Sequence, residues 1–507
     1  MVKTLLINPP VTTYGSDSPA SIYIPIGLAY LAAYLRQNNY EVKILDALAE
    51  GEVQRGDGFI RRGMTLQQII EYIDAYKPDI IGISCMYTAY ARDAHEIAEA
   101  VKNLNYKILV IFGGAHSSIN YSIVMKDKNV DIVVRREGEK TLLELINAIA
   151  KGRNWKEVRG ITFHNNGAVK TNPEQEYIND IDTIPFPARD LLPRNIYNTL
   201  RSPYWMRPPL DVIVSSRGCP KRCIYCSIHS VWGNKWRARS AKNVVDEMEL
   251  LVKEGIKEVH FTDDNISVDK RRMYEICDEI INRRLDIKWT MPNGIALWTL
   301  DKELLIKMKR AGCYRLTFGV ETGNQKMQRY IGKNLDLRYA RKVIRWANDL
   351  GFWTISTHII GFPYETKKEM KDTFNFALKS GTDFALFYAL TPFLGTAVFE
   401  EFKKEGLLPT ELENIDEYRE FFISEFACDT KLFKKEEIIK IQTGMYKKFI
   451  IYRFIQMIFN PFKIMKKIKN IEDLHYTVKM FMNFINININ LLKAKHMGAK
   501  VLYGRKK

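Results

Sequence analysis

The chain has 507 residues, of which 46% are apolar and 27% charged, and its formal net charge is +17. This is the composition of a soluble globular protein, and the length predicts two to four domains rather than one hydrophobic core. No stretch reaches the roughly 20 uninterrupted apolar residues that cross a bilayer. Leu5-Leu6-Ile7 ends at Pro9-Pro10, too early for a signal peptide, so we expect a cytoplasmic protein.

Residues 1–150 alternate short apolar runs with segments of helical spacing, such as 25–37 and 91–104. The apolar runs, each followed by turn signals, are 4–7, 42–45, 80–83 and 108–111. This βαβα order predicts an α/β fold whose first domain is a doubly wound, Rossmann-like parallel sheet. Ligands of such sheets bind at the carboxyl ends of the strands.

Residues 151–207 are expected to form a linker with a small hairpin, since Asn165-Asn166-Gly167 signals a turn. From 208 to 409 the βα alternation resumes and predicts a partial (β/α)6 barrel of the TIM type. Its expected strands are 211–215, 258–262, 287–291, 314–319, 354–360 and 384–390. Residues 410–507 have the pattern of a basic, amphipathic helical domain.

Seven cysteines, three of them within eight residues, favour a metal site over disulfides in a cytoplasmic chain. Cys219, Cys223 and Cys226 have the spacing CxxxCxxC directly after the strand expected at 211–215. Three thiolates ligate three irons of a cubane cluster and leave the fourth open, whereas electron-transfer clusters use four cysteines. Zinc is the alternative, because a structural zinc site needs four ligands and His229 could supply the fourth.

The segment from Gly218 to Cys226, with Tyr225 before the last cysteine, resembles the signature of the radical S-adenosylmethionine (SAM) superfamily. The resemblance implies a [4Fe–4S] cluster on the three cysteines, with SAM chelated at the open iron and Tyr225 near its adenine. An electron from an external donor of the ferredoxin or flavodoxin type then breaks SAM. The resulting 5′-deoxyadenosyl radical abstracts hydrogen from a substrate, and the protein orients the reactants and excludes water. Such an enzyme is oxygen-sensitive.

Later strand ends carry further landmarks of this family. Thr262-Asp263-Asp264-Asn265 follows the second barrel strand, where relatives bind the methionine amine of SAM. Phe318-Gly-Val-Glu321-Thr-Gly323 resembles the strand end at which Glu321 would contact the ribose. The predicted SAM contacts are therefore Tyr225, Asp263, Asp264, Asn265 and Glu321.

The segment 1–150 resembles the B12-binding domain that is fused to many radical SAM enzymes. Its landmarks include Gly113-Gly-Ala-His116 and Arg136-Glu-Gly-Glu139. The resemblance implies cobalamin across the carboxyl edge of the sheet, with Ser84, Gly113 and Gly114 near its nucleotide tail. The cobalt-ligating form has Asp-x-His-x-x-Gly after the second strand, but this chain has Leu48 in place of the histidine. Leucine cannot ligate cobalt, so the sequence leaves cobalamin binding open.

The basic charge is concentrated at the carboxyl end. Residues 431–507 contain 18 Lys and Arg and four Asp and Glu, a net +14. Bulky apolar residues alternate with cations over 446–459, Asn460-Pro461 breaks this helix, and a second helix is expected over 474–492. One interpretation is a helical domain on the barrel with a solvated lysine face. Another is an interfacial helix on anionic lipid headgroups, which would place the protein on the inner face of the membrane.

Nucleic acid is a third partner class, because lysines with interleaved aromatic residues also suit RNA. Radical SAM enzymes that modify tRNA, however, have three further amino-terminal cysteines and a carboxyl-terminal β-barrel. This chain has only Cys85 in that region, and its tail has a helical pattern. The sequence therefore disfavours nucleic acid as a partner.

The function expected from these features is radical C–H activation of a hydrophobic, membrane-lipid substrate by cyclisation, carbon–carbon bond formation or methylation. Relatives in this branch act on hopanoids, archaeal lipids and tetrapyrroles, and the barrel is rich in aromatic residues. Those that we expect in its loops are Trp232, Trp236, Trp289, Trp298, Phe387 and Phe393. The alternatives are a cobalamin-dependent methyltransferase of a non-lipid small molecule, an RNA-modifying enzyme, and a non-enzymatic iron–sulfur electron carrier.

Overall fold

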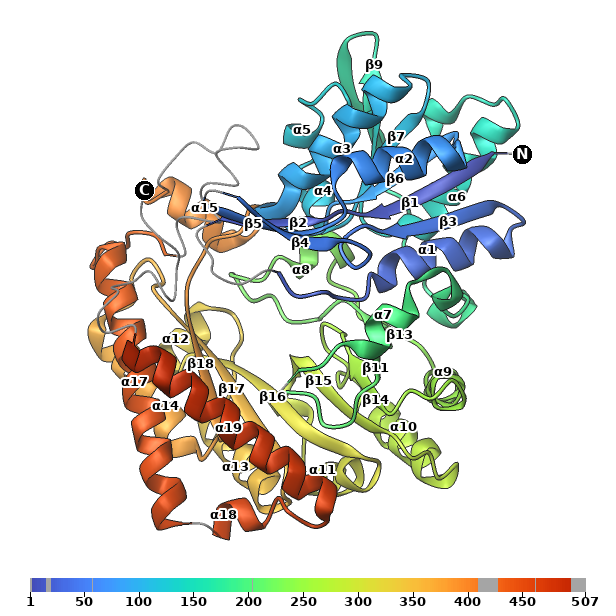
Figure 1. Ribbon diagram of the computed structural model, residues 1–507. Coiled ribbons are helices and arrows are strands. Elements are labelled where there is room, and N and C mark those ends of the chain that lie inside the picture. Colours follow the sequence, from blue (N-terminus) through green and yellow to red (C-terminus); the bar gives the residue numbers. More distant parts are fainter. Residues whose placement is uncertain are drawn as a thin grey trace.

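The computed structural model describes residues 2–14, 20–56, 58–202, 204–408, 427–460 and 462–493. A doubly wound sheet lies above a partial barrel in the view of Figure 1, and the carboxyl-terminal helices flank the barrel. The α/β fold class predicted from the sequence is confirmed.

The amino-terminal sheet has the strand order β10-β9-β8-β7-β6-β1-β3. Its five parallel strands are β1 (Lys3–Asn8), β3 (Glu41–Asp46), β6 (Ile80–Ser84), β7 (Leu109–Gly113) and β8 (Ile132–Val134). The hairpin predicted in the linker forms as β9 (Ile161–Asn165) and β10 (Ala168–Thr171), and β9 continues this sheet by pairing antiparallel to β8. Helices cover both faces, so two separate apolar clusters form on the two sides. The helices are α1 (Ile26–Gln37), α2 (Leu66–Tyr76), α3 (Ala91–Leu104), α4 (Ala115–Ile119), α5 (Tyr121–Val124) and α6 (Gly138–Ala150).

A small antiparallel sheet, which the sequence did not predict, extends from the carboxyl edge of the large one. It consists of β2 (Val11–Tyr14), β4 (Glu52–Gly56) and β5 (Phe59–Gly63), in the order β2-β5-β4. Its strands are short and polar, so they lack the apolar runs by which strands are recognised. Gly51 is required where this sheet begins, because a Cβ there would lie 1.8 Å from the carbonyl carbon of Gly63.

The six barrel strands predicted from the sequence are confirmed, and all pair in parallel in chain order. They are β11 (Leu210–Ile213), β14 (Glu258–Phe261), β15 (Lys288–Ile295), β16 (Cys313–Glu321), β17 (Trp353–Ile360) and β18 (Phe384–Ala389). A two-stranded ribbon, β12 (Ser216–Arg217) with β13 (Arg237–Ala238), follows β11. The helices of this part are α7 (Arg194–Thr199), α8 (Ile228–Trp232), α9 (Ala241–Lys253), α10 (Lys270–Asn282), α11 (Lys302–Arg310), α12 (Gln325–Tyr330), α13 (Leu337–Asp349), α14 (Lys367–Ser380) and α15 (Ala397–Lys404).

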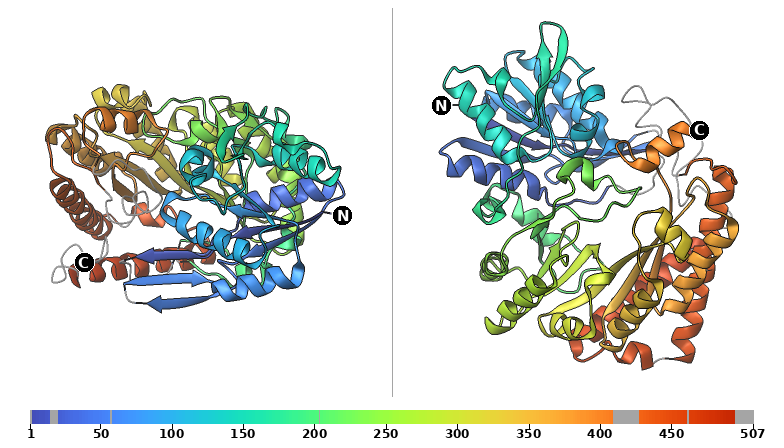
Figure 2. Two further views of the ribbon diagram at one scale, coloured as in Figure 1. Left: turned by 90° about the horizontal axis from the view of Figure 1, so that it is seen from above. Right: turned by 180° about the vertical axis from the view of Figure 1, so that it is seen from behind.

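Three helices end the described chain: α17 (Lys435–Phe459), α18 (Phe462–Met465) and α19 (Ile471–Lys493). Helix α17 runs down the side of the barrel and α18 lies at its foot, as Figure 2 shows from behind, while α19 crosses in front of the strands in Figure 1. The helical tail and its break near Asn460 are confirmed within 435–493, whereas residues 410–426 and 494–507, also predicted to be helical, lie outside the described residues. Among the described residues, no helix combines the length and apolar character needed to cross a membrane.

The edge strand β18 is covered by α17. Gln442 donates from Nε2 to the carbonyl oxygen of Phe387 at 2.7 Å, and Tyr446 accepts the Phe387 N–H at 2.9 Å. The cover satisfies backbone groups that a bare edge would expose. The opposite end of the tail closes the amino-terminal ends of the strands, where Tyr476 of α19 contacts the rings of Tyr314 and Trp353.

Candidate functional site

The cysteine loop connects β12 to α8 at the carboxyl edge of the barrel. Gly218 has φ +83°, and a Cβ there would lie 2.7 Å from the carbonyl oxygen of Lys235, so only glycine fits. Its N–H donates to Asp264 Oδ2 at 3.0 Å. Further along the loop, Ile224 donates to Ile331 and accepts from Val398, both at 3.0 Å. Segments more than 100 residues away in the chain therefore hold the loop.

The three thiols predicted as cluster ligands lie on this loop and are partly exposed. Burial raises the pKa of Cys223, and it raises that of Cys226 to about 12, with the neighbouring thiols adding to both shifts. Such thiols stay protonated until a metal displaces the protons. Within the described residues, no three His, Cys, Asp or Glu side chains are close enough together to hold one metal ion. The zinc alternative requires four ligands that converge on one ion. Three free thiols on one loop are the donor set of a cluster with one open iron.

The second strand end brings its predicted residues to this loop, in three different roles. Asp263 is buried, and its carboxylate already accepts from Ser215 and Ser216, at 2.7 and 2.5 Å from the two hydroxyls. Asp264 holds the loop through Gly218, and burial raises its pKa to about 7. Asn265 donates from Nδ2 to the sulfur of Cys219 at 3.7 Å.

Glu321 ends β16 in a left-handed conformation, with φ +66°, and is only 8% exposed. Such a conformation is costly for a residue other than glycine and is retained where the surroundings enforce it. Lys333 lies 2.9 Å from Glu321 Oε1. Although burial alone would lower the pKa of Lys333, Glu321 and the thiols of Cys223 and Cys226 raise it. Tyr225 lies in the same cluster, and burial raises its pKa well above the usual value, with Glu321 and Cys223 adding to the shift.

The sequence did not reveal Lys333, or two other buried residues of this region. His358 hydrogen-bonds through Nε2 to Ser356 Oγ at 2.9 Å, and its Nδ1 has no partner. Burial lowers its pKa to about 3, and Lys333 adds to the shift. Glu365 accepts the Gly361 N–H at 2.7 Å, and burial raises its pKa to about 8. A lysine after a helix and a histidine inside a strand have no motif in the sequence, and only the fold brings them here.

At the carboxyl edge of the amino-terminal sheet, Ser84 and Gly113 are register partners at the ends of β6 and β7. Gly114 has φ +107°, and a Cβ there would lie 2.8 Å from the carbonyl oxygen of Cys85. A Cβ on Gly113 would meet only the carbonyl oxygen of Val134, at 3.9 Å, so space is open beside it. His116 follows and is buried, with Nδ1 3.0 Å from Thr88 Oγ1 and Nε2 without a partner.

Leu48 lies in the turn after β3 and is completely buried. The aspartate before it, Asp46, accepts from Asn8 at 2.7 Å and from the Tyr197 hydroxyl. The turn is therefore filled by the protein's own side chains. Position 48 neither ligates cobalt nor faces an open edge.

Buried ion pairs join the carboxyl edge of the barrel to the carboxyl edge of the amino-terminal sheet. Arg217, two residues before Cys219, contacts Glu137 at 2.9 Å and Glu139 at 2.5 Å. Arg237 of the paired strand contacts Glu137 at 2.7 Å. These two glutamates begin α6 of the upper domain, so their contacts tie it directly to the cysteine loop.

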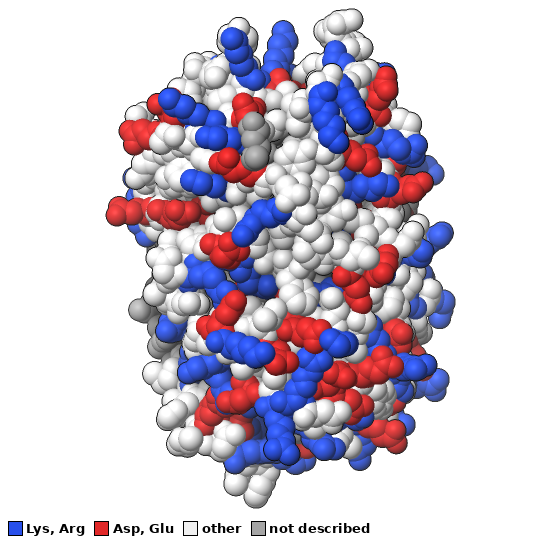
Figure 3. All heavy atoms as spheres, turned by 90° about the vertical axis from the view of Figure 1, so that its right-hand side faces the viewer, with Lys and Arg blue, Asp and Glu red and all other residues white. Residues whose placement is uncertain are grey.

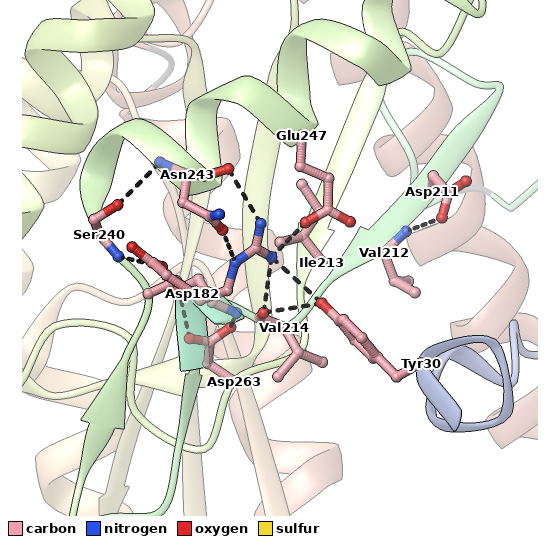
Figure 4. Close-up of polar contacts among 12 residues, drawn as sticks. Tyr30, Asp182, Asp211, Val212, Ile213, Val214, Ser240, Asn243, Glu247 and Asp263 are labelled. Atoms are coloured by element: carbon pink, nitrogen blue, oxygen red, sulfur yellow. Dashed lines mark hydrogen bonds and ion pairs between the residues drawn. The ribbon is translucent and has the colours of Figure 1, made fainter. Parts of the chain in front are cut away.

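A second set of contacts also joins the two domains. In Figure 4, Tyr30 extends from α1 to the backbone of Val214, and its hydroxyl donates to the Val214 carbonyl oxygen at 3.3 Å. Arg239 donates to the same carbonyl at 3.2 Å and to Glu247 of α9. Helix α4, which carries His116, also packs against α8 beyond the cysteines. The thiols and the upper sheet edge thus face a shared region.

Two predicted aromatic contacts are corrected by the structure. Trp289 and Phe387 were expected in the barrel loops, but both are completely buried, Trp289 in the main core of the barrel. Both residues lie within strands, Trp289 in β15 and Phe387 in β18, and pack against the helices that cover the barrel. Trp298 and Trp236 do lie near the cysteine loop. Lys221 stacks over the ring of Trp298 at 4.7 Å, and Trp236 donates to the carbonyl of Asn265 at 2.8 Å.

Comparison with known proteins agrees with this architecture. The model of the radical SAM superfamily matches residues 213–377, and that of the B12 binding domain matches residues 16–146. The chain is 33% identical to an uncharacterized methyltransferase of Pyrococcus horikoshii, over 89% of this chain and 92% of the relative. It is 32% identical to the cytidylyl-2-hydroxyethylphosphonate methyltransferase of Streptomyces wedmorensis, over 81% of this chain and 83% of the relative.

Among solved structures, the fold is similar to that of the radical S-adenosylmethionine methyltransferase TsrM from Kitasatospora setae. The TM-score is 0.71 at 20% identity, covering 88% of this chain and 89% of that one. The protein belongs to the radical SAM enzymes that carry an amino-terminal B12-binding domain. Enzymes of this class use SAM and a [4Fe–4S] cluster, and they require an electron donor and a substrate.

Proposed function

We propose that this enzyme is a radical SAM methyltransferase that binds a [4Fe–4S] cluster through Cys219, Cys223 and Cys226. The observation that carries the proposal is the junction of the cysteine loop with the carboxyl edge of the B12-binding domain, made by Arg217. The names of the two relatives at 32–33% identity support methyl transfer over cyclisation. When bound, the cofactors supply a radical that removes hydrogen from carbon and a carrier for the methyl group.

The chain's own residues would hold and shield these groups. The amide of Asn265 donates to Cys219 Sγ. The ammonium of Lys333 is close enough to Cys223 and Cys226 to interact electrostatically with both thiols. Both favour the thiolate form that ligates iron. For SAM we propose Tyr225, Asp264, Asn265 and Glu321 as contacts. Asp263 is less available as a SAM contact, because its carboxylate already accepts hydrogen bonds from Ser215 and Ser216.

For cobalamin, the edge residues Ser84, Gly113 and Gly114 would accommodate the nucleotide tail. The open space beside Gly113 and the unpartnered Nε2 of His116 fit a polar ligand at this edge. Leu48 excludes a protein ligand to cobalt from the usual position. We therefore propose that cobalamin binds at this edge without a cobalt ligand from residue 48. If the protein binds no cobalamin, the alternative reaction is cyclisation or another carbon–carbon bond formation.

The proposed substrate is a hydrophobic small molecule, and a membrane lipid is one member of that class. Support comes from exposed aromatic side chains near the two edges, Tyr87 after β6 (51% exposed) and Tyr388 in β18 (47% exposed). Tyr388 is close enough to Glu321 for that carboxylate to add to its raised pKa, which is due first to burial. The cationic tail gives no support to a lipid substrate, since α19 closes the other end of the barrel.

The test is anaerobic reconstitution with iron, sulfide and cobalamin, the proposed acceptor of the methyl group, followed by SAM carrying an isotope-labelled methyl group and a reductant. Formation of 5′-deoxyadenosine and S-adenosylhomocysteine is expected from the wild type and from Cys277→Ala, a buried control, and not from Cys219→Ala. Cobalamin retention, measured by visible absorbance, separates methyl transfer from the rival reactions. A protein that holds its cluster but forms no 5′-deoxyadenosine would disprove the radical chemistry.

A further inference from the structure

The outward side of the carboxyl-terminal helices is apolar. Nearly half of the large apolar side chains that are exposed in the described part of the chain lie between residues 451 and 482. The most exposed are Phe459 (82%), Phe462 (70%), Ile471 (65%), Met465 (60%), Ile451 (59%) and Met482 (54%). We name the exposed apolar residues of 451–482 the C-terminal apolar face. A monomer rarely leaves so large an apolar group exposed without a partner.

The inward side of the same helices carries buried cations. Arg453 is 4% exposed and donates to the carbonyl oxygens of Ala377 and Leu378, at 3.0 and 3.1 Å. Lys467 is 2% exposed and pairs with Asp383 at 2.9 Å. The carbonyls at the end of α14 lack helical partners, so cations are favourable there. These cations, together with buried apolar side chains such as Phe449 and Tyr476, fix the helices to the barrel, and the residues of the C-terminal apolar face remain exposed.

A basic groove adjoins this face. Lys466 of α18 pairs with Asp349 at the end of α13, at 2.8 Å. Helix α13 carries cations at every turn of its outer side, and they surround a shallow depression of about 510 Å³. Its lining consists of Arg338, Arg341, Lys342, Arg345, Trp346 and Asp349. One acid among four cations leaves this groove strongly positive.

The excess of cations is local. On the opposite side of the molecule, shown in Figure 3, positive and negative side chains alternate over the surface. Helix α10 lies on that side in Figure 1, and Arg283 at its end pairs with Asp246 at 2.7 Å and with Glu249 at 3.1 Å. The carboxyl-terminal segment carries a net +14 over 431–507, and some of its cations, such as Lys466 and Lys467, are paired with acids of the barrel.

We propose that the C-terminal apolar face and the α13 groove together dock on an anionic membrane surface. Aromatic and aliphatic side chains would enter the headgroup region while the arginines and lysines of α13 contact lipid phosphates, the pattern of a helix that lies on a membrane. Charge complementarity favours this occupant over a second copy of the chain, because two such faces would repel each other.

Docking in this way sets the orientation of the enzyme. Tyr476 and Met480 of α19 pack on Tyr314, Trp353 and Phe384, which stand at the amino-terminal ends of their strands. The thiols lie at the opposite ends, and eight residues of β17 span about 25 Å at 3.3 Å per residue. The cofactor site therefore faces away from the membrane.

The experiment is flotation of the anaerobically prepared full chain with vesicles, one set of pure phosphatidylcholine and one with added phosphatidylglycerol. The first variant is Phe459→Asp with Phe462→Asp, at exposed positions where folding is not at risk. The second is Arg338→Glu with Arg345→Glu. Leu250→Asp, at a position 46% exposed on α9, is the matched control. Size-exclusion chromatography with light scattering, and binding to a labelled RNA, are measured alongside.

We expect the wild type and Leu250→Asp to float with anionic vesicles at near-physiological salt. Each double variant should bind at least about tenfold more weakly, and high salt should weaken wild-type binding. Absence of vesicle binding by the wild type, or binding that neither variant changes, would overturn the proposal. So would a dimer that Phe459→Asp with Phe462→Asp converts to a monomer, or RNA binding tighter than vesicle binding. Because no step involves the cofactors, the outcome is independent of the reaction proposed above.

Discussion

The ion pairs of Arg217 allow a quantitative prediction about the junction of the two domains. The side chains of Arg217, Glu137 and Glu139 are 6%, 4% and 6% exposed. Replacing Arg217 with Met leaves Glu139 without its cation, whereas Glu137 keeps Arg237 at 2.7 Å. Removing one partner of a buried pair costs about 3–5 kcal/mol, and the surviving pair places this case near 3 kcal/mol. At about 1.4 kcal/mol per factor of ten, the junction should open about 100-fold more often.

The assay is hydrogen–deuterium exchange of the amides of 214–219 in wild type and Arg217→Met, because exchange reports local opening. Arg36→Met is the control, since Arg36 and Asp190 form an exposed pair, 46% and 63% exposed, in which about 1 kcal/mol or less is at stake. Protection should fall about 100-fold in the first variant and hardly in the second. Equal protection in wild type and Arg217→Met would refute the reasoning.

The pH dependence of this junction has a definite sign. Burial alone would raise the pKa of Glu139, but Arg217 lowers it below the usual value. A depressed carboxyl pKa stabilises the folded form above the ordinary value of about 4.3 and loses that contribution as the pH falls. The exchange rates of wild type and Arg217→Met should therefore converge in acid.

Three further predictions concern single positions. Gly218→Ala should lower the iron bound per chain after reconstitution, because the new Cβ would lie 2.7 Å from the carbonyl oxygen of Lys235. The control is Gly255→Ala, where the backbone φ is also positive but the space is open. It should lower the free energy of unfolding by only about 1–2 kcal/mol and leave the bound iron unchanged. Glu365→Gln should abolish a loss of thermal stability between about pH 5 and pH 8, since a raised carboxyl pKa makes the folded form less stable as the pH rises; an unchanged pH profile would contradict this. Arg453→Met should lower the free energy of unfolding, measured in urea, by about 1.5–3 kcal/mol, because the hydrogen bonds to Ala377 and Leu378 are lost. Lys448→Met, at an exposed position, should leave that free energy unchanged.

The regular part of the fold was predictable because its strands are apolar runs. All six barrel strands and four strands of the upper sheet match the positions predicted from the sequence, within a few residues. The exceptions have a physical cause. Strand β8 has only three residues, and β4 and β5 are polar. None of the three therefore produces a sequence pattern that differs from that of a loop.

The candidate site was predictable only where its residues are local in sequence. The three cysteines form one motif, and a strand end identifies Asp264 and Asn265. Lys333 and Arg217 could not be found in this way, because their partners lie 12 and about 80 residues away in the chain. Whether a charged side chain is exposed or paired depends on tertiary packing, which the sequence pattern does not reveal. The carboxyl-terminal helices are a second example. In the tail, Arg453 is buried beside apolar residues such as Phe449, whereas Phe459 is exposed, and neither placement is expected of an ordinary surface helix.

The position of the tail also constrains how a hydrophobic substrate reaches the site. If the C-terminal apolar face lies on a membrane, the thiols are at least about 25 Å from the lipid surface, the length of the barrel strands. A lipid whose acyl chains stay in the bilayer could not place them at the cofactors, so a lipid substrate would have to leave the membrane completely. A small molecule that diffuses to the site avoids that cost, about 0.8 kcal/mol for each methylene withdrawn from the bilayer. Membrane docking through the C-terminal apolar face would therefore favour a free hydrophobic small molecule over a resident membrane lipid.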